Sequence, residues 1–301
     1  MKQIKLSCQA ISWSNHKIAD VIEDIAELGF EGIELLLEKV LFSDLDWKEL
    51  SSLLKNCNIS ISAIYQTLRL GNNNNYLRDY EIKQCKALLT MIKNLGIEFL
   101  IVSDPPIAAN NDSTILAESL EKLGSYAKSE GVRLCYHPHR GSIIEKPEQI
   151  EKLLSLTSSD NVSLCFDTGH IFWGGGDPAF LLRTYINRIA YIQMKDIRRR
   201  DFTSLEILVE LYKTLKIKEQ RINKLRYIGQ RFLNKTTPIV TETGKGEIDF
   251  ESIVLSLYDL NYTGWITIEF DAPTINPKAS LSRCLNKVNQ YMTKYSKRKI
   301  N

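Results

Sequence analysis

The sequence predicts an α/β protein with the (β/α)8 architecture of a TIM barrel. Short apolar runs recur eight times along the chain, segments of helical periodicity lie between them, and several of those segments end on a glycine. Repeated β-α units whose strands are apolar on both faces favour a closed parallel barrel. A chain of 301 residues is long enough to form such a barrel as one domain.

Each predicted strand is a short run rich in apolar and β-branched residues. The eight runs are residues 4–11, 32–36, 59–65, 98–104, 132–138, 162–168, 189–196 and 265–271. An open, doubly wound sheet is the alternative arrangement for alternating strands and helices. No GxGxxG motif follows the first run, which weakens that alternative.

Helical segments are expected in the intervals between the strands. The apolar residues between Ile18 and Leu28 fall on one helical face, and those between Leu88 and Leu95 fall on another. The stretches ELGFEGIEL, NLGIEFL and SEGVRLC each place a glycine between a helix and the next strand. Glycine is favoured there because a helix often ends in the left-handed conformation.

The regular spacing breaks after the seventh strand, where residues 198–241 form a longer connection. It contains LEILVELYKTLKIKEQRINKLRYIGQRFL, which has a helical period and a basic outer face. Loops at the carboxyl ends of barrel strands usually shape the active site, so we expect a helical insertion that covers the barrel mouth. Contact with a partner is its alternative role. The prediction is a single domain over residues 1–301.

Composition excludes several classes of protein. The chain has no apolar run near the roughly 18 residues that a membrane span needs, and its N-terminus lacks a long secretory hydrophobic segment. The net charge of +3 is too small to indicate nucleic-acid binding. Six cysteines form no CxxC pair, as in a protein of the reducing cytoplasm. We expect a cytoplasmic protein that acts on a small molecule, with a homo-oligomer left open.

Polar side chains gather where the predicted strands end, which is where active sites lie in such barrels. Three of the four histidines, His137, His139 and His170, fall at these ends, together with Asp167 and Glu269. Any one of them alone is more simply a hydrogen-bonded polar group at a strand terminus. Together, these nitrogen and oxygen donors suit Mn²⁺, Co²⁺, Zn²⁺ or Fe²⁺, so we predict a metal site.

Four segments carry a family resemblance along nearly the whole chain. CFDTGHIFWGGGDP, RIAYIQMKDIR, TETGKGEIDF and YTGWITIEFD, in that order, resemble the xylose-isomerase-like TIM-barrel superfamily of sugar isomerases and epimerases. Within it, IKLSCQAISWSN, YHPHRGSIIE and FLNKTTPIVTETGKGEIDF look most like the inosose (2-keto-myo-inositol) dehydratases of inositol catabolism. The resemblance implies a lyase that removes water from a polyol-like keto-cyclitol.

The resemblance also implies a set of metal ligands. Asp167 and Glu269 match the aspartate of the sixth strand and the glutamate of the eighth, and His137 occupies the ligand position of the fifth. Gln193 stands where the family has a ligating histidine. An amide oxygen is a weaker donor than imidazole towards Zn²⁺ or Co²⁺. Gln193 therefore indicates a shifted metal preference, a weaker site or a lost activity. Mn²⁺ or Co²⁺ is the expected metal.

Dehydration requires removal of a proton next to the carbonyl, stabilisation of the enediolate by a metal, and protonation of the departing hydroxyl. The candidate acid and base groups are Lys195, His139, His170 and Glu269. For Lys195 the alternative is a structural ion pair with Asp196 or Glu34. The candidate substrate-binding residues are Trp13, Glu34 and Arg140, although Trp13 could be packing and Arg140 a solvated side chain.

Three other functions compete with the dehydratase. A metal-dependent keto-sugar isomerase or epimerase uses the same proton abstraction without loss of water. The DNA-endonuclease branch of the barrel needs more histidine and acid ligands than this chain offers. A barrel that has lost its metal through Gln193 would bind a ligand or a partner without catalysis.

Overall fold

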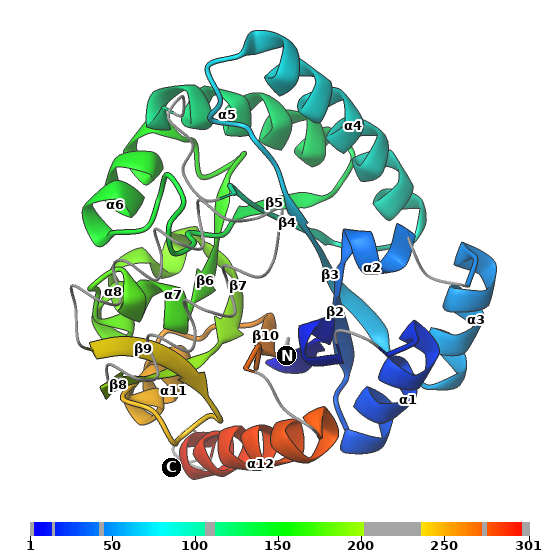
Figure 1. Ribbon diagram of the computed structural model, residues 1–301, viewed down its shortest axis with the longest axis vertical. Helices are drawn as coiled ribbons and strands as arrows, with labels where there is room; N and C mark the ends of the chain where they lie inside the picture. The colour runs from blue at the N-terminus through cyan, green and yellow to red at the C-terminus, as the bar shows by residue number, and fades with distance from the viewer. Residues whose placement is uncertain are drawn as a thin grey trace, which may run out of the picture.

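The computed structural model describes residues 3–13, 16–41, 45–105, 112–201, 236–272 and 276–296. Eight parallel strands close into a barrel in the order β1-β10-β7-β6-β5-β4-β3-β2, with helices around it (Figure 1). The strands are β1 Lys5–Gln9, β2 Gly32–Leu36, β3 Ser60–Thr67, β4 Phe99–Ser103, β5 Arg133–Tyr136, β6 Ser163–Asp167, β7 Ile189–Met194 and β10 Trp265–Ile268. The predicted (β/α)8 TIM barrel is therefore confirmed.

Helices connect the strands along the outside of the barrel. The longer ones are α1 Ile18–Leu28, α3 Trp47–Asn56, α4 Asn75–Asn94, α5 Ser113–Ser129, α6 Pro147–Leu156, α8 Pro178–Tyr185, α11 Phe250–Asp259 and α12 Pro277–Ser296. The shorter elements are α2 Leu37–Leu41, α7 Thr168–Trp173 and the 3₁₀ turns Ala10–Trp13 and Ile186–Arg188. Helix α1 ends as predicted, since Gly29 has φ 88° and its N–H caps the last turn.

The connection after β7 begins and ends as an antiparallel ribbon. Strand β8 Asp196–Asp201 pairs with β9 Thr236–Thr241. The buried Asp196 carboxylate fixes the following turn, because it accepts hydrogen bonds from the N–H groups of Gly244 and Gly246, both at 2.8 Å. The predicted helical insertion over 198–241 was therefore wrong at its two ends, which are strands. Residues 202–235 lie outside the described part of the chain, so a helix within them and its covering role stay predictions.

The core has two parts. A large apolar layer fills the space between barrel and helices. The inside of the barrel holds a smaller cluster that includes Phe99, Tyr191 and Trp265. Polar groups also enter the barrel, where the Tyr191 hydroxyl lies 2.7 Å from Ser62 Oγ. All six cysteines are free.

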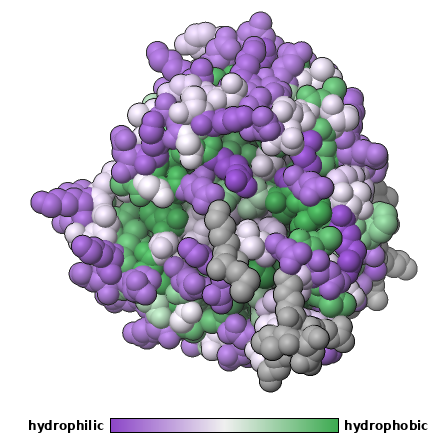
Figure 2. Space-filling model, turned by 180° about the vertical axis from the view of Figure 1, so that it is seen from behind, coloured by the Kyte–Doolittle hydropathy of each residue, from purple (hydrophilic) through white to green (hydrophobic). Residues whose placement is uncertain are grey.

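The outer surface is mixed in character. Figure 2 shows hydrophilic side chains over most of one face, with hydrophobic areas between them. Among the described residues, no helix combines the length and the apolar character that crossing a membrane requires.

Candidate active site

The predicted polar side chains converge at the carboxyl ends of neighbouring strands. His137 follows β5, Asp167 ends β6, Lys195 follows β7 and Glu269 follows β10, while His170 lies in the first turns of α7. All five are buried. Donor atoms of His137, Asp167 and His170 lie within 4.8 Å of one another. The fold thus assembles one compact group from segments far apart in the sequence.

The two carboxylate oxygens of Asp167 make different contacts. Its Oδ1 accepts a hydrogen bond of 2.7 Å from the backbone N–H of His170 and so caps α7. Its Oδ2 lies 3.7 Å from His137 Nε2 and 3.6 Å from Lys195 Nζ. Burial opposes ionisation, but Lys195 and His137 together hold the pKa of Asp167 below its usual value.

Lys195 is the only cation that the described residues bring into contact with this group of acids. Its Nζ lies 2.5 Å from Glu269 Oε1 and 3.5 Å from Asp271 Oδ2. Burial disfavours the ammonium form, yet Asp271, Glu269 and Asp167 raise the pKa of Lys195 well above its ordinary value. Lys195 is thus ion-paired, but with these three acids and not with Asp196 or Glu34, the partners of the alternative interpretation. Asp271 was missed, although it lies two residues after Glu269.

The stem of Lys195 packs against the glycine of the DTGH segment. A Cβ on Gly169 would lie 2.8 Å from Lys195 Cγ and 2.9 Å from Lys195 Cδ. Glycine at this position therefore gives the lysine the space to reach the carboxylates.

The rings of the three histidines pack against one another, edge-on or tilted. The ring centroids of His139 and His170 are 4.0 Å apart, and those of His137 and His170 are 5.1 Å apart. Burial lowers the pKa of all three, that of His139 to about 3. All three rings are consequently neutral at pH 7.

A hydrogen bond sets the proton position on one of these rings, that of His139. His170 Nδ1 accepts the backbone N–H of Arg140 at 3.1 Å, and its Nε2 lies 3.2 Å from Lys195 Nζ. His139 Nδ1 donates to the Arg140 carbonyl at 2.8 Å, which leaves its Nε2 as an acceptor.

His137 is oriented by a residue that sequence reasoning missed. Its Nδ1 lies 3.4 Å from the Tyr65 hydroxyl, which in turn lies 2.6 Å from Ser103 Oγ. A ring held at Nδ1 presents Nε2 to the centre of the group. The only sequence signal for Tyr65 was its place near the end of the third predicted strand.

Three buried atoms in the group have no hydrogen-bond partner among the described residues. They are His137 Nε2, Asp167 Oδ2 and Glu269 Oε2. Leaving such atoms unpaired costs free energy, so they call for an explanation. One nitrogen and two carboxylate oxygens form a donor set that suits a divalent transition metal.

Gln193 and Glu34 meet across the inside of the barrel, and both are fully buried. Gln193 Nε2 donates to Glu34 Oε1 at 2.7 Å, and Gln9 Nε2 donates to the same oxygen at 2.6 Å. Gln193 Oε1 accepts a weak hydrogen bond from Cys165 Sγ at 3.3 Å. Burial raises the pKa of Glu34 to about 7. Gln9 was missed, since a glutamine at a strand end carries no distinctive signal.

The remaining predicted residues, Arg140 and Trp13, differ in their surroundings. The Arg140 guanidinium lies over the Trp173 ring at 5.0 Å, on the segment that carries His139. Trp13 is fully buried, and its indole N–H donates to Asp24 on α1 at 3.0 Å. The described contacts therefore give Trp13 a packing environment and do not bring it to the histidines.

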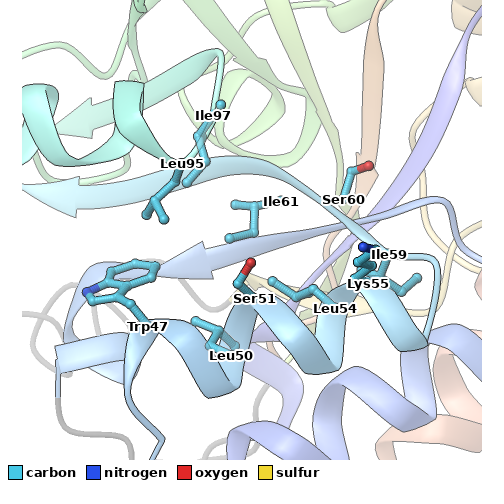
Figure 3. A pocket seen from close by; sticks show the side chains of 11 residues that line it. Trp47, Leu50, Ser51, Leu54, Lys55, Ile59, Ser60, Ile61, Leu95 and Ile97 are labelled. Carbon is cyan, nitrogen blue, oxygen red and sulfur yellow. The ribbon is translucent and has the colours of Figure 1, made fainter.

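A separate pocket of about 270 Å³ lies on the outside of the barrel. Figure 3 shows Trp47, Leu50 and Leu54 of α3 on one side of it and Ile61 of β3 above them. None of the predicted site residues lines this pocket. It is a gap between helix and barrel and is distinct from the histidine group.

Comparisons with known proteins agree with this architecture. Residues 22–287 match the family described as xylose isomerase-like TIM barrel. A protein named inosose dehydratase from Clostridium perfringens (strain 13 / Type A) is 28% identical over 291 residues, which cover 88% of this chain and 89% of the relative. One of the same name from Mesomycoplasma hyopneumoniae (strain J) is 28% identical, with 89% of each chain covered.

Solved structures share the fold at low sequence identity. The IolI protein, whose crystal structure contains a bound zinc atom, aligns with a TM-score of 0.72 at 17% identity and covers 97% of this chain and 99% of its own. An L-ribulose 3-epimerase aligns with a TM-score of 0.71 at 14% identity, covering 98% and 97%. The extent of the family match decides the classification: this chain belongs to the xylose isomerase-like TIM barrel family.

Proposed function

We propose that this protein is a metal-dependent hydro-lyase that removes water from a keto-cyclitol, inosose (2-keto-myo-inositol), in myo-inositol catabolism. The relatives named inosose dehydratase support the substrate and the reaction type. The observation that carries the metal dependence is the set of unpaired buried atoms on His137, Asp167 and Glu269. The polar side chains around these atoms offer hydrogen-bond donors and acceptors for the hydroxyl groups of a polyhydroxy ketone.

The ligands that we propose are His137, Asp167 and Glu269, with Gln193 as the fourth. Mn²⁺ or Co²⁺ suits this mixture of one imidazole with oxygen donors. His170 is not included, because Arg140 N–H occupies its Nδ1 and Lys195 faces its Nε2. A bound divalent cation would act as a Lewis acid on the substrate carbonyl and so acidify the neighbouring C–H bond.

The chain's own groups then account for the proton movements. Glu269 takes the proton from the carbon next to the carbonyl, and the electrons of that bond form the new double bond. Lys195 donates a proton to the departing hydroxyl, which leaves as water. The proton on Glu269 returns to Lys195 across their 2.5 Å contact, which restores the starting state.

Substrate orientation falls to the neighbouring polar groups. His139 offers an acceptor at Nε2, and the His170 ring lies beside it. Arg140, beside them, would bind substrate hydroxyls. We assign Trp13 to packing, because its indole already has a partner on α1.

The location and assembly belong to the same proposal. A cytoplasmic enzyme is supported by six unpaired cysteines and by relatives named as metabolic enzymes. The small molecule is the expected partner, and a homo-oligomer and the single domain over 1–301 stay predictions.

The test is to incubate the purified full-length protein with inosose and Mn²⁺ or Co²⁺, and then after chelation. The expected result is a metal-dependent rise in ultraviolet absorbance from an unsaturated dione-type product. Interconversion of keto sugars without loss of water would instead favour the epimerase, the activity in the name of one structural neighbour. A protein that binds neither Mn²⁺ nor Co²⁺ would overturn the metal-dependent reading.

A further inference from the structure

We infer that Glu34 is a positioning residue, which orients the side-chain amide of Gln193 so that the amide oxygen points towards strand β6. This orientation allows Gln193 to bind the metal through oxygen. The inference rests on the proposed metal site. It assigns Glu34 a role different from the substrate contact that its sequence position predicted.

Two amide groups converge on a single oxygen of Glu34. Gln9 Nε2 on β1 and Gln193 Nε2 on β7 donate to Glu34 Oε1 at 2.6 and 2.7 Å. Glu34 Oε2 has no hydrogen-bond partner among the described residues. Oε1 therefore acts as an acceptor whether or not a proton sits on Oε2, and both glutamines must present their NH₂ ends to it.

This contact decides which end of the Gln193 amide faces the site. The reversed amide would place two acceptor oxygens 2.7 Å apart, so it is excluded while Glu34 Oε1 carries no proton. The Gln193 oxygen then lies on the β6 side, where Cys165 Sγ reaches it at 3.3 Å. Asp167 is the β6 residue in direct register with Gln193. The amide oxygen is thus held on the side of the strand that carries a proposed ligand.

The arrangement has a consequence for the metal. A histidine at this place would offer a nitrogen donor, whereas an amide oxygen favours harder cations such as Mn²⁺. Glu34 acts only through Gln193. This role requires only a hydrogen-bond acceptor at the Oε1 position. It does not require the negative charge of the carboxylate.

The experiment compares Glu34→Gln with Glu34→Met in the full-length protein, using Mn²⁺ alone as the probe and calorimetric titration as the readout. Glu34→Gln keeps an acceptor oxygen and should bind Mn²⁺ within about threefold of wild type, while Glu34→Met should bind it about 10- to 100-fold more weakly, as loss of an orienting group does at metal sites. Equal losses in both variants would overturn the inference, because the charge would then be the essential feature. No loss in Glu34→Met would also overturn it.

Two further variants separate positioning from folding. Asp104→Asn removes another buried carboxylate, one that contacts Tyr136 and Gly71, and should leave Mn²⁺ affinity unchanged. The double variant Glu34→Met/Gln193→Leu should lose no more affinity than Gln193→Leu alone, since both act through one amide oxygen. Additive losses would contradict the coupling. Absence of Mn²⁺ binding by the wild type would instead count against the proposed function.

Discussion

The ammonium group of Lys195 lies 2.5 Å from Glu269 Oε1, with both side chains almost fully buried. Asp167 and Asp271 lie within 3.6 Å of the same nitrogen. One cation thus balances two buried carboxylates, Asp167 and Glu269, and the more exposed Asp271. Breaking such a set by removing one charge is costly, because the remaining charges stay buried without compensation.

We therefore expect Lys195→Met to destabilise the metal-free protein by about 3–5 kcal/mol. Added Mn²⁺ should recover part of this loss, because a bound cation replaces the missing charge. Urea unfolding with and without Mn²⁺ measures both effects. The exposed pair of Lys128 with Asp160 is the control, and Lys128→Met should cost less than about 1 kcal/mol. An equal loss of unfolding free energy in the two variants would show that burial of the charges around Lys195 is unimportant.

Gly169→Ala should displace the Lys195 stem, because the added methyl group would meet Cγ and Cδ below 3.0 Å. Overpacking of this kind costs about 1–3 kcal/mol, and a shifted ammonium should lower the rate of dehydration with little effect on substrate affinity. The cost should shrink in a Lys195→Ala background, where both of those atoms are absent. If Gly169→Ala destabilised both backgrounds equally, the added methyl group would clash with atoms other than those of the Lys195 stem. Thermal unfolding and steady-state kinetics supply the measurements.

Most of the barrel was predictable because its strands are buried on both faces and appear as apolar runs. The errors lie at the strand ends. The fifth strand was predicted to run to residue 138 and the eighth to 271, but β5 ends at Tyr136 and β10 at Ile268. His137 and Glu269 come directly after these ends and leave the sheet to enter the site, which a hydrophobic pattern does not reveal.

The site was partly predictable for a related reason. Charged residues at strand ends are conspicuous, so Asp167, Lys195 and Glu269 could be found. Tyr65 and Gln9 could not, because neutral residues of common types give no signal until their partners are known. The orientation of the His170 ring depends on a backbone N–H from another loop, and only the folded chain supplies that contact.

Gln193→His should move the metal preference towards Zn²⁺. An imidazole can donate one N–H to Glu34 and offer its other nitrogen to the metal, and nitrogen donors suit Zn²⁺ better than an amide oxygen does. We expect the ratio of Zn²⁺ to Mn²⁺ affinity to rise about tenfold, or about 1.4 kcal/mol of binding free energy. Competition titration measures the ratio. Gln290→His, which places a histidine on an exposed part of α12, should leave it unchanged.

The neutral histidines predict how stability depends on pH. Burial lowers the pKa of His139 to about 3, whereas an unfolded histidine has a pKa near 6.5. Between these values the unfolded chain binds a proton that the folded chain does not, so this residue's contribution to stability falls as pH falls from about 6.5 towards 3. Glu34 and Asp104 act in the opposite direction, since burial raises the pKa of each to about 7.

A variant isolates the histidine contribution, because the carboxyl effects cancel in a difference. In metal-free protein, His139→Gln should lose less stability than wild type between pH 6 and pH 4.5, by up to about 1.4 kcal/mol per pH unit. Urea unfolding at several pH values in a chelating buffer measures the two slopes. Parallel slopes would mean that His139 takes up its proton in the folded chain as readily as in the unfolded one. In that case the His139 ring would be available as a base near neutral pH. The removal of the proton next to the carbonyl would then be assigned to His139 in place of Glu269.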